Sequence, residues 1–165
     1  MALDISAIKQ EIKSLLVANN TTTSSVFLSN NMTTRVKKVY TVNPEKIELT
    51  ANATPYVTIY TDRKSIEQAD IARNQAIARR QTDLTLNIVG ALWNQNFSAD
   101  ITKDPADDDL EYLMENIEEV LRQYPDLEGN VSWQVPEETD YFSMPIDEDS
   151  HFRAARLKLK CRVFY

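Results

Sequence analysis

The chain has 165 residues, with 18 basic and 25 acidic side chains and a formal net charge of −7. It contains only two glycines, Gly90 and Gly129, where average usage would give about 11. Glycine-rich phosphate loops, dinucleotide-binding turns and the nucleophile elbow of hydrolases need two or more closely spaced glycines, so the sequence excludes these motifs. The acidic total also argues against sequence-independent coating of nucleic acid, which needs a net positive face.

The length and the 42% hydrophobic fraction predict one domain over residues 1–165 with a single buried core. No apolar run approaches the roughly 20 residues of a membrane span, and the first residues lack the basic flank and apolar stretch of a signal peptide. We therefore expect the protein to stay in the cytoplasm of its producing cell. Cys161 is the only cysteine, which excludes an intramolecular disulfide.

The N-terminal segment has apolar residues at spacings of three and four from Leu3 to Leu16, which predicts an amphipathic helix that ends near Val17. Asp4 or Ser6 could cap this helix. The Asn- and Thr-rich run that follows is expected to stop it, because short polar side chains compete for backbone hydrogen bonds.

Residues 19–54 are rich in Thr and Asn and poor in aliphatic side chains, which predicts a polar arm or a long loop insertion. Two stretches, Arg35–Val42 and Lys46–Thr50, favour extended structure on either side of Asn43-Pro44, as in a β-hairpin. A loop of this length in a compact domain is usually either functional or disordered. The alternatives are thus an arm that engages a neighbour and an insertion without a role.

The middle of the chain favours strands. Residues Pro55–Thr61 are aromatic and β-branched, which predicts a strand that ends at Asp62. Ser65–Gln81 fits either a helix with a capping box or an alternating strand, and its type stays open. Asp83–Trp93 alternates more clearly and predicts a long, half-buried strand.

The strongest helix signal covers Pro105–Gln123, with Asp104 as its cap and three further aspartates in the first turn, where the helix dipole favours negative charge. Val131–Val135 then predicts a short strand that Pro136 closes. The acidic residues that follow predict a connector over residues 137–149.

The last strand alternates most clearly, from Phe152 to Phe164, a length of about 43 Å if fully extended, which could reach beyond its own subunit. One face is apolar and the other basic: Ala155, Leu157, Leu159, Cys161 and Val163 against Arg156, Lys158, Lys160 and Arg162. Together these elements predict an α+β fold, with a mixed or antiparallel sheet of about four to five strands packed on an N-terminal and a central helix.

No group of residues predicts catalysis or metal binding, and we expect no catalytic, cofactor-binding or metal-binding residues and no cofactor. The carboxylates cluster at a helix start and in the connector, where solvated or capping charge explains them. His151 has no second histidine or nearby cysteine to complete a metal set. Cys161 falls on an apolar strand face, where a free thiol acts as a small hydrophobe.

The basic stripe of Arg156, Lys158, Lys160 and Arg162 is the candidate site, as a subunit or partner interface. Four like charges on one strand face repel one another unless negative groups answer them. Those groups could be the acidic helix, the 137–149 connector, a neighbouring subunit or a phosphate backbone. These alternatives stay open on the sequence alone.

The order of the elements resembles the tail terminator, or tail completion, proteins of long-tailed bacteriophages. The segments that carry the resemblance cover about two thirds of the chain: Leu3–Leu16, Pro55–Thr61, Asp83–Trp93, Asp107–Tyr124, Val131–Val135 and Ala154–Tyr165. Residues 19–54 depart from the family by their length, which affects the details of assembly. The family has no catalytic residues to carry over, so the resemblance implies that the protein is not an enzyme.

The resemblance further implies a structural virion protein that forms a homo-oligomeric ring, commonly of six subunits, at the head-proximal end of the tail tube. Its partners would be the tail tube protein and a neck or head-completion protein, and it would be assembled in the host cytoplasm and located at the tail–neck junction. DNA would pass through the ring without specific binding, and an acidic lumen would keep the duplex from sticking. The alternatives are another head–tail connector or neck adaptor, and a small cytoplasmic binding module or enzyme.

Overall fold

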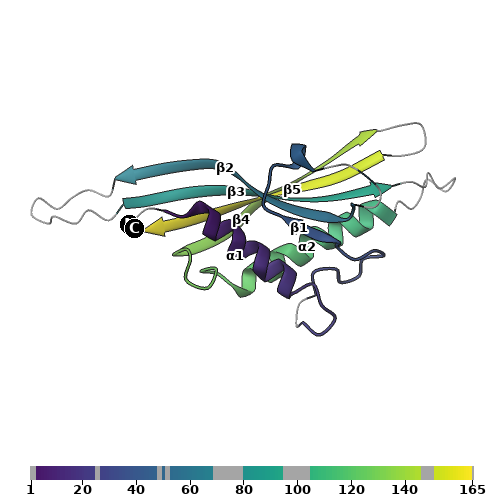
Figure 1. Ribbon diagram of the computed structural model, residues 1–165, viewed down its shortest axis with the longest axis horizontal. Helices are drawn as coiled ribbons and strands as arrows, with labels where there is room; N and C mark the ends of the chain where they lie inside the picture. Colours follow the sequence, from purple (N-terminus) through teal and green to yellow (C-terminus); the bar gives the residue numbers. More distant parts are fainter. Residues whose placement is uncertain are drawn as a thin grey trace, which may run out of the picture.

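The computed structural model describes residues 3–24, 27–47, 50, 53–68, 80–94, 105–145 and 151–164. It confirms the predicted α+β class, with two helices and one five-stranded mixed sheet (Figure 1). The elements in chain order are α1 (Ile5–Ala18), β1 (Lys38–Tyr40), the 3-10 turn η1 (Pro44–Lys46), β2 (Tyr56–Gln68), β3 (Arg80–Asn94), α2 (Pro105–Gln123), β4 (Trp133–Pro145) and β5 (His151–Phe164). Neither described helix is both long and apolar enough to cross a membrane.

The sheet has the strand order β1-β2-β3-β5-β4. The short β1 runs parallel to β2, and the other neighbours pair antiparallel. Strand β5 lies inside the sheet, with β3 paired along its whole length on one side and β4 on the other. The expectation that the last strand extends beyond its own subunit is therefore wrong, because both of its edges are already used within the domain.

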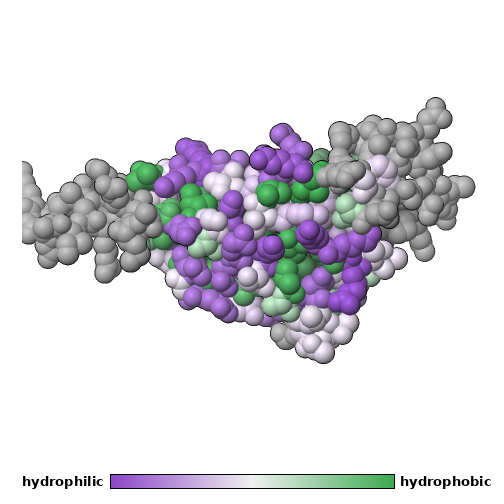
Figure 2. All heavy atoms as spheres, viewed as in Figure 1, coloured by the Kyte–Doolittle hydropathy of each residue, from purple (hydrophilic) through white to green (hydrophobic). Residues whose placement is uncertain are grey.

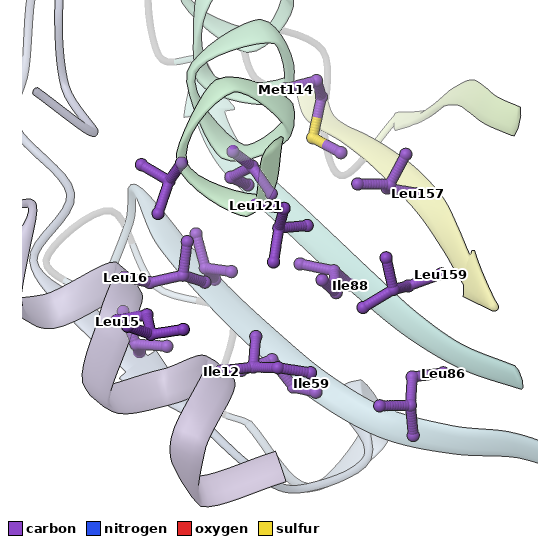
Figure 3. Packing of buried hydrophobic residues seen from close by; sticks show 14 of the residues in the cluster. Ile12, Leu15, Leu16, Ile59, Leu86, Ile88, Met114, Leu121, Leu157 and Leu159 are labelled. Carbon is purple, nitrogen blue, oxygen red and sulfur yellow. The ribbon is translucent and has the colours of Figure 1, made fainter. Parts of the chain in front are cut away.

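Both helices pack on one face of the twisted sheet, which we call the helix-covered face (Figure 1). Figure 3 shows Ile12 and Leu16 of α1 and Leu121 of α2 directed toward Ile59, Ile88 and Leu159 of the strands. The apolar face predicted for β5 lies in this core, and Cys161 is fully buried there. Gly90 permits close contact with α2, because a Cβ atom at this position would lie 2.8 Å from Cδ2 of Leu113.

The ends of the helices follow elementary capping rules. Asp4 caps α1 as predicted, since its Oδ1 accepts a hydrogen bond of 2.9 Å from the Ala7 amide. The bounds predicted for α2 are confirmed, whereas its predicted cap Asp104 lies outside the described residues. At the other end of α2, the Gln134 amide donates to the carbonyl oxygens of Leu121 and Tyr124, at 2.6 and 3.2 Å. A β4 side chain thus adds a hydrogen bond to two carbonyls at the end of α2, which also accept from the backbone amides of Tyr124 and Leu127.

The predicted hairpin within residues 19–54 is wrong. Strand β1 covers only three residues and pairs parallel with β2, while the second predicted stretch begins in η1. The described part of this segment also packs onto the domain: Asp109 Oδ1 accepts from the Thr33 amide at 2.8 Å, and Asn116 donates to the carbonyl of Leu28 at 2.9 Å. Long-range hydrogen bonds and burial of Leu28 hold the described residues of this segment against the domain.

The second face of the sheet, opposite the helices, carries a smaller apolar cluster beside η1, which lies above the sheet in Figure 1. Ile47 packs there with Tyr56 of β2, Val89 of β3 and Phe152 of β5. The Thr58 hydroxyl donates to the Val42 carbonyl and so fixes the chain that leads to η1. Burial, with a smaller effect of nearby Tyr40, raises the pKa of Tyr56 to about 12. Away from this cluster the second face is largely polar and charged, with Trp133 and Val135 of β4 as apolar exceptions.

Strand β4 is much longer than predicted. The expected stop at Pro136 and the acidic connector from residue 137 are wrong, because residues 137–145 continue the strand. The register shifts between Pro136 and Glu138, which marks a β-bulge. A bulge in an edge strand tolerates proline, since the missing N–H removes no regular ladder bond. The acidic residues therefore lie beside β5 instead of in a loop.

Candidate functional site: the charged ladder

The four predicted site residues lie in a row on the second face of β5. Each makes an ion pair within the chain, and we call these four cations and their four carboxylates the charged ladder: Arg156–Asp140, Lys158–Glu138, Lys160–Glu137 and Arg162–Asp83. Three of the acids come from β4 and one from β3. The sequence left open which negative groups lie beside the basic stripe. In the structure they are three acids of the predicted 137–149 connector and one aspartate of β3.

Strand register places the carboxylates of the charged ladder. Asp140 lies opposite Arg156 and Glu138 opposite Lys158 in the antiparallel pairing of β4 with β5. The Asp140 Oδ2 to Arg156 Nη2 distance is 2.8 Å. Glu137 is the extra residue of the bulge, and its Oε1 lies 3.9 Å from Lys160 Nζ. Opposite charges directly across an antiparallel pair stabilise the sheet, whereas the unanswered stripe would destabilise it.

Arg162 has the most elaborate environment in the row. Its Nε and Nη2 donate to the two carboxylate oxygens of Asp83 at 2.7 and 2.9 Å, which is a bidentate pair. Its guanidinium also lies 5.0 Å from the ring centroid of Trp133 on β4, a cation–π contact. Arg162 therefore bridges β3 and β4 across β5.

The ion pairs shift the proton affinities of their members. Hydrogen bonding to Arg162 lowers the pKa of Asp83 below its usual value, and hydrogen bonding to Arg156 does the same to the pKa of Asp140. Conversely, hydrogen bonding to Asp140 raises the pKa of Arg156, and hydrogen bonding to Glu138 raises the pKa of Lys158. These shifts favour the charged forms of Asp83, Asp140, Arg156 and Lys158, and the charged ladder pairs four cations with four carboxylates.

The charged ladder offers no chemistry of its own. Lys158, whose pKa is raised, is a poor nucleophile, and Asp83 and Asp140, whose pKa values are lowered, are poor general bases near neutral pH. Burial raises the pKa of Cys161 to about 12, which keeps its thiol protonated. Within the described ranges, no cluster of three histidine, cysteine or acidic side chains is arranged to hold a metal ion. The side chain of His151 lies outside the described residues.

Sequence reasoning found the cations but missed Asp83 and Trp133 as their partners. The alternation of the strand Asp83–Trp93 placed Asp83 on one of its faces, but nothing in the sequence indicated that β3 and β5 are neighbours. Trp133 was predicted to lie in a strand, whose pairing was equally unspecified. Only the strand order brings Asp83 into the charged ladder and places Trp133 against Arg162.

Comparison with known proteins adds no identification. No known protein family matches the sequence, and no curated protein matches it significantly.

Proposed function

We propose that the protein is a tail terminator subunit of a long-tailed bacteriophage, a structural protein and not an enzyme. It would form an oligomeric ring on the head-proximal end of the tail tube, stop tube polymerisation and present a docking surface to the neck. The order of elements that resembles the family supports this proposal. The observation that carries it is the single mixed sheet, which has both helices on one face and a broad, largely polar second face.

The second face suits a surface that neighbours or passing DNA meet. Each of the four cations of the charged ladder has an acid beside it, so the charged ladder offers no unbalanced positive strip to a phosphate backbone. Affinity of this kind depends on the phosphates that a protein neutralises. DNA would therefore pass without being held. A reconstruction of the assembled ring with a predominantly basic channel wall would contradict this part of the proposal.

The direct test is a tube-length assay. Purified protein would be added to polymerising tail tube protein of the same virus, and tube lengths would be measured by electron microscopy with the protein located on the tubes. We expect shorter tubes with the protein bound at one end only. Unchanged tube lengths with no bound protein would overturn the proposal.

Deletion of the gene from the virus separates the proposal from the neck-adaptor alternative. A missing terminator should give overlong or headless tails. A missing adaptor should give tails of normal length beside unjoined heads, and this second outcome would assign the protein to the head side of the junction.

A further inference from the structure

The acidic residues are concentrated in one part of the molecule. Residues 105–145, which include α2 and β4, contain twelve acidic residues and one arginine, for a net charge of −11. The rest of the chain contains thirteen acidic and seventeen basic residues, for a net charge of +4. Because β4 is the outermost strand on one side of the sheet and α2 packs beside it, this side of the molecule is strongly acidic.

The acidic side of the molecule ends in an open strand edge. The outer side of β4 pairs with no described strand, and beyond the bulge at Pro136 the strand continues regularly over residues 138–145, which we call the β4 edge. Tyr141 and Phe142, in the middle of the β4 edge, are 49% and 46% exposed. An open edge with exposed apolar side chains is a template for an added strand, which forms main-chain hydrogen bonds along it.

Three glutamates of α2 lie around the Tyr141 side chain, which strand register places on the helix side of β4. Glu111, Glu115 and Glu118 follow one side of α2 at spacings of four and three. The Thr139 hydroxyl of β4 donates to Glu118 Oε1 at 3.5 Å, so this side of α2 lies over the β4 edge. Burial, followed by the negative charges of the three glutamates, raises the pKa of Tyr141.

Two of these glutamates have no cation beside them among the described residues. Glu111 and Glu115 are exposed and form no ion pair with a described residue. Glu118, in contrast, pairs with Arg122 at 3.5 Å. A lysine or arginine side chain of an added strand would pair with the free carboxylates and contact the Tyr141 ring. The helix side of the β4 edge therefore selects a cation.

The second face of the β4 edge selects a different side chain. Glu138 and Asp140 lie on this face, where the cations of the charged ladder already balance them. Phe142 lies there too, opposite Ala154 of the apolar cluster beside η1. An apolar side chain of an added strand would bury part of the Phe142 ring. Because successive side chains of a strand alternate between faces, the β4 edge selects an alternation of basic and apolar residues.

A second copy of this chain does not supply such a strand. Two β4 edges paired about a two-fold axis would bring the α2 glutamates and the β4 acids of both copies together, and like charges across a strand pair are destabilising. The β2 edge of a second copy offers one described cation on its helix side, Lys64, because Arg63 lies opposite Thr85 on the second face. The charge of the β4 edge therefore favours a different protein.

We propose that the β4 edge binds an extended segment of another protein in which lysine or arginine alternates with apolar residues. The segment adds a strand to the sheet beside β4. Its cations lie on the helix side, near Tyr141, Glu111 and Glu115, and an apolar side chain lies beside Phe142 on the second face. This inference goes beyond the proposed function and does not depend on it, since it follows from the surroundings of α2 and β4.

The test measures binding of a fluorescein-labelled peptide of about eight residues, the length of the β4 edge, in which lysine alternates with threonine or valine. Fluorescence anisotropy with the full chain would be recorded at about 50 mM and about 0.5 M salt. We expect saturable binding of one peptide per chain at low salt. The affinity should fall at least about tenfold at high salt, because salt screens the contacts with the glutamates.

Two charge-matched double variants locate the binding site. Glu111→Gln with Glu115→Gln should weaken peptide binding at least about tenfold, because the charged partners of the lysines are lost. Glu45→Gln with Asp62→Asn changes the net charge equally at exposed positions on η1 and in the β2 bulge, and it should bind the peptide normally. Circular dichroism would verify that both variants fold.

Peptide N-methylation separates strand addition from charge attraction alone. Successive N–H groups of a strand point to opposite edges, so methyl groups on every second nitrogen block pairing in one phase and leave it possible in the other. We expect one methylated peptide to lose binding and the other to keep it. Hydrogen exchange should show that the bound peptide slows alternate amides of the β4 edge.

Four results would overturn the inference. The first is no saturable binding of the lysine peptide at low salt. The second is equal binding of both methylated peptides and the unmodified one, which would indicate charge attraction without an added strand. The third is equal weakening in the two double variants. The fourth is an unchanged protein that is oligomeric in sedimentation velocity with the β4 edge amides already protected, which would make a second copy the occupant.

Discussion

The two faces of the sheet are held by different forces. The helix-covered face is an apolar core in which Leu84, Leu86 and Ile88 of β3 are completely buried. The second face of the same strand carries Asp83 and Thr85 instead, and the neighbouring face of β5 is charged. Burial of apolar area contributes about 25 cal/mol per Å², whereas exposed ion pairs contribute about 0–1 kcal/mol each. The fold therefore depends on one face and leaves the other available for contacts.

The largest effect should come from the helix-covered face. Ile88→Ala removes a fully buried side chain between β2 and β5 and should lower the free energy of unfolding by about 3 kcal/mol, because the packed neighbours cannot fill the space. Urea denaturation would measure the loss. Val135→Ala, exposed on the second face, is the control and should change stability by about 0.5 kcal/mol or less. Equal losses in the two variants would contradict the comparison.

The second largest effect should come from the most buried pair of the charged ladder. The Asp83 side chain is 15% exposed and accepts two hydrogen bonds from Arg162. Asp83→Asn should cost about 1.5 kcal/mol, since hydrogen bonds to charged groups contribute more than neutral ones. Asp140→Asn, at a well-exposed pair, should cost clearly less in the same denaturation experiment. A larger loss for Asp140→Asn than for Asp83→Asn would show that exposure does not decide how much each ion pair of the charged ladder stabilises the fold.

The pH dependence of stability tests the contribution of the Asp83–Arg162 pair in a second way. The pKa of Asp83 is lower in the folded chain than its ordinary value, so ionised Asp83 stabilises the folded state. This contribution to the free energy of unfolding is fully present above about pH 4 and is lost as the pH falls through the folded pKa. Unfolding measured between about pH 5 and pH 2 should show a shallower loss of stability for Asp83→Asn than for the unchanged protein. Parallel curves would indicate that the pair with Arg162 does not persist in solution.

The smallest effect on stability should follow reversal of the exposed cations. Lys158→Glu with Lys160→Glu should leave the domain folded, because both ion pairs lie at the surface. The same change should weaken ring or neck assembly if the charged ladder is an interface. Thermal unfolding would monitor the fold and virion yield the assembly. Unchanged virion yield would contradict the interface role of these two lysines.

Local patterns predicted much of the fold. The 3.6-residue periodicity gave both helices, and the bounds of α2 match because a proline start and a run of apolar residues define it. Strict alternation predicted β5 and the face of each of its side chains correctly, from Arg156 to Val163. These patterns depend only on residues that are close in the sequence, so they can be recognised without knowledge of the tertiary structure.

Long-range relationships could not be predicted in the same way. The sequence identified the cations of the candidate site, but Asp83 and Arg162 become partners only through the pairing of β3 with β5. The length of β4 was missed because Pro136 normally ends a strand, and only the bulge allows it to continue. Strand β1 was misassigned for a related reason, since a three-residue parallel contact has no pattern of its own.

The bulge in β4 changes which residues share a side of the strand. Before it, the odd-numbered Trp133 and Val135 lie opposite Arg162 and Lys160; after it, the even-numbered Glu138 and Asp140 lie opposite Lys158 and Arg156. Loss of Glu137 would remove the bulge and leave a regular ladder in which Glu138 and Asp140 still lie opposite Lys158 and Arg156, although the pair of Glu137 with Lys160 would be lost. The segment 136–138 is therefore the part of β4 that can lose one residue and keep its cross-strand partners, whereas loss of a residue from a regular part of the strand would turn the side chains beyond it to the other face.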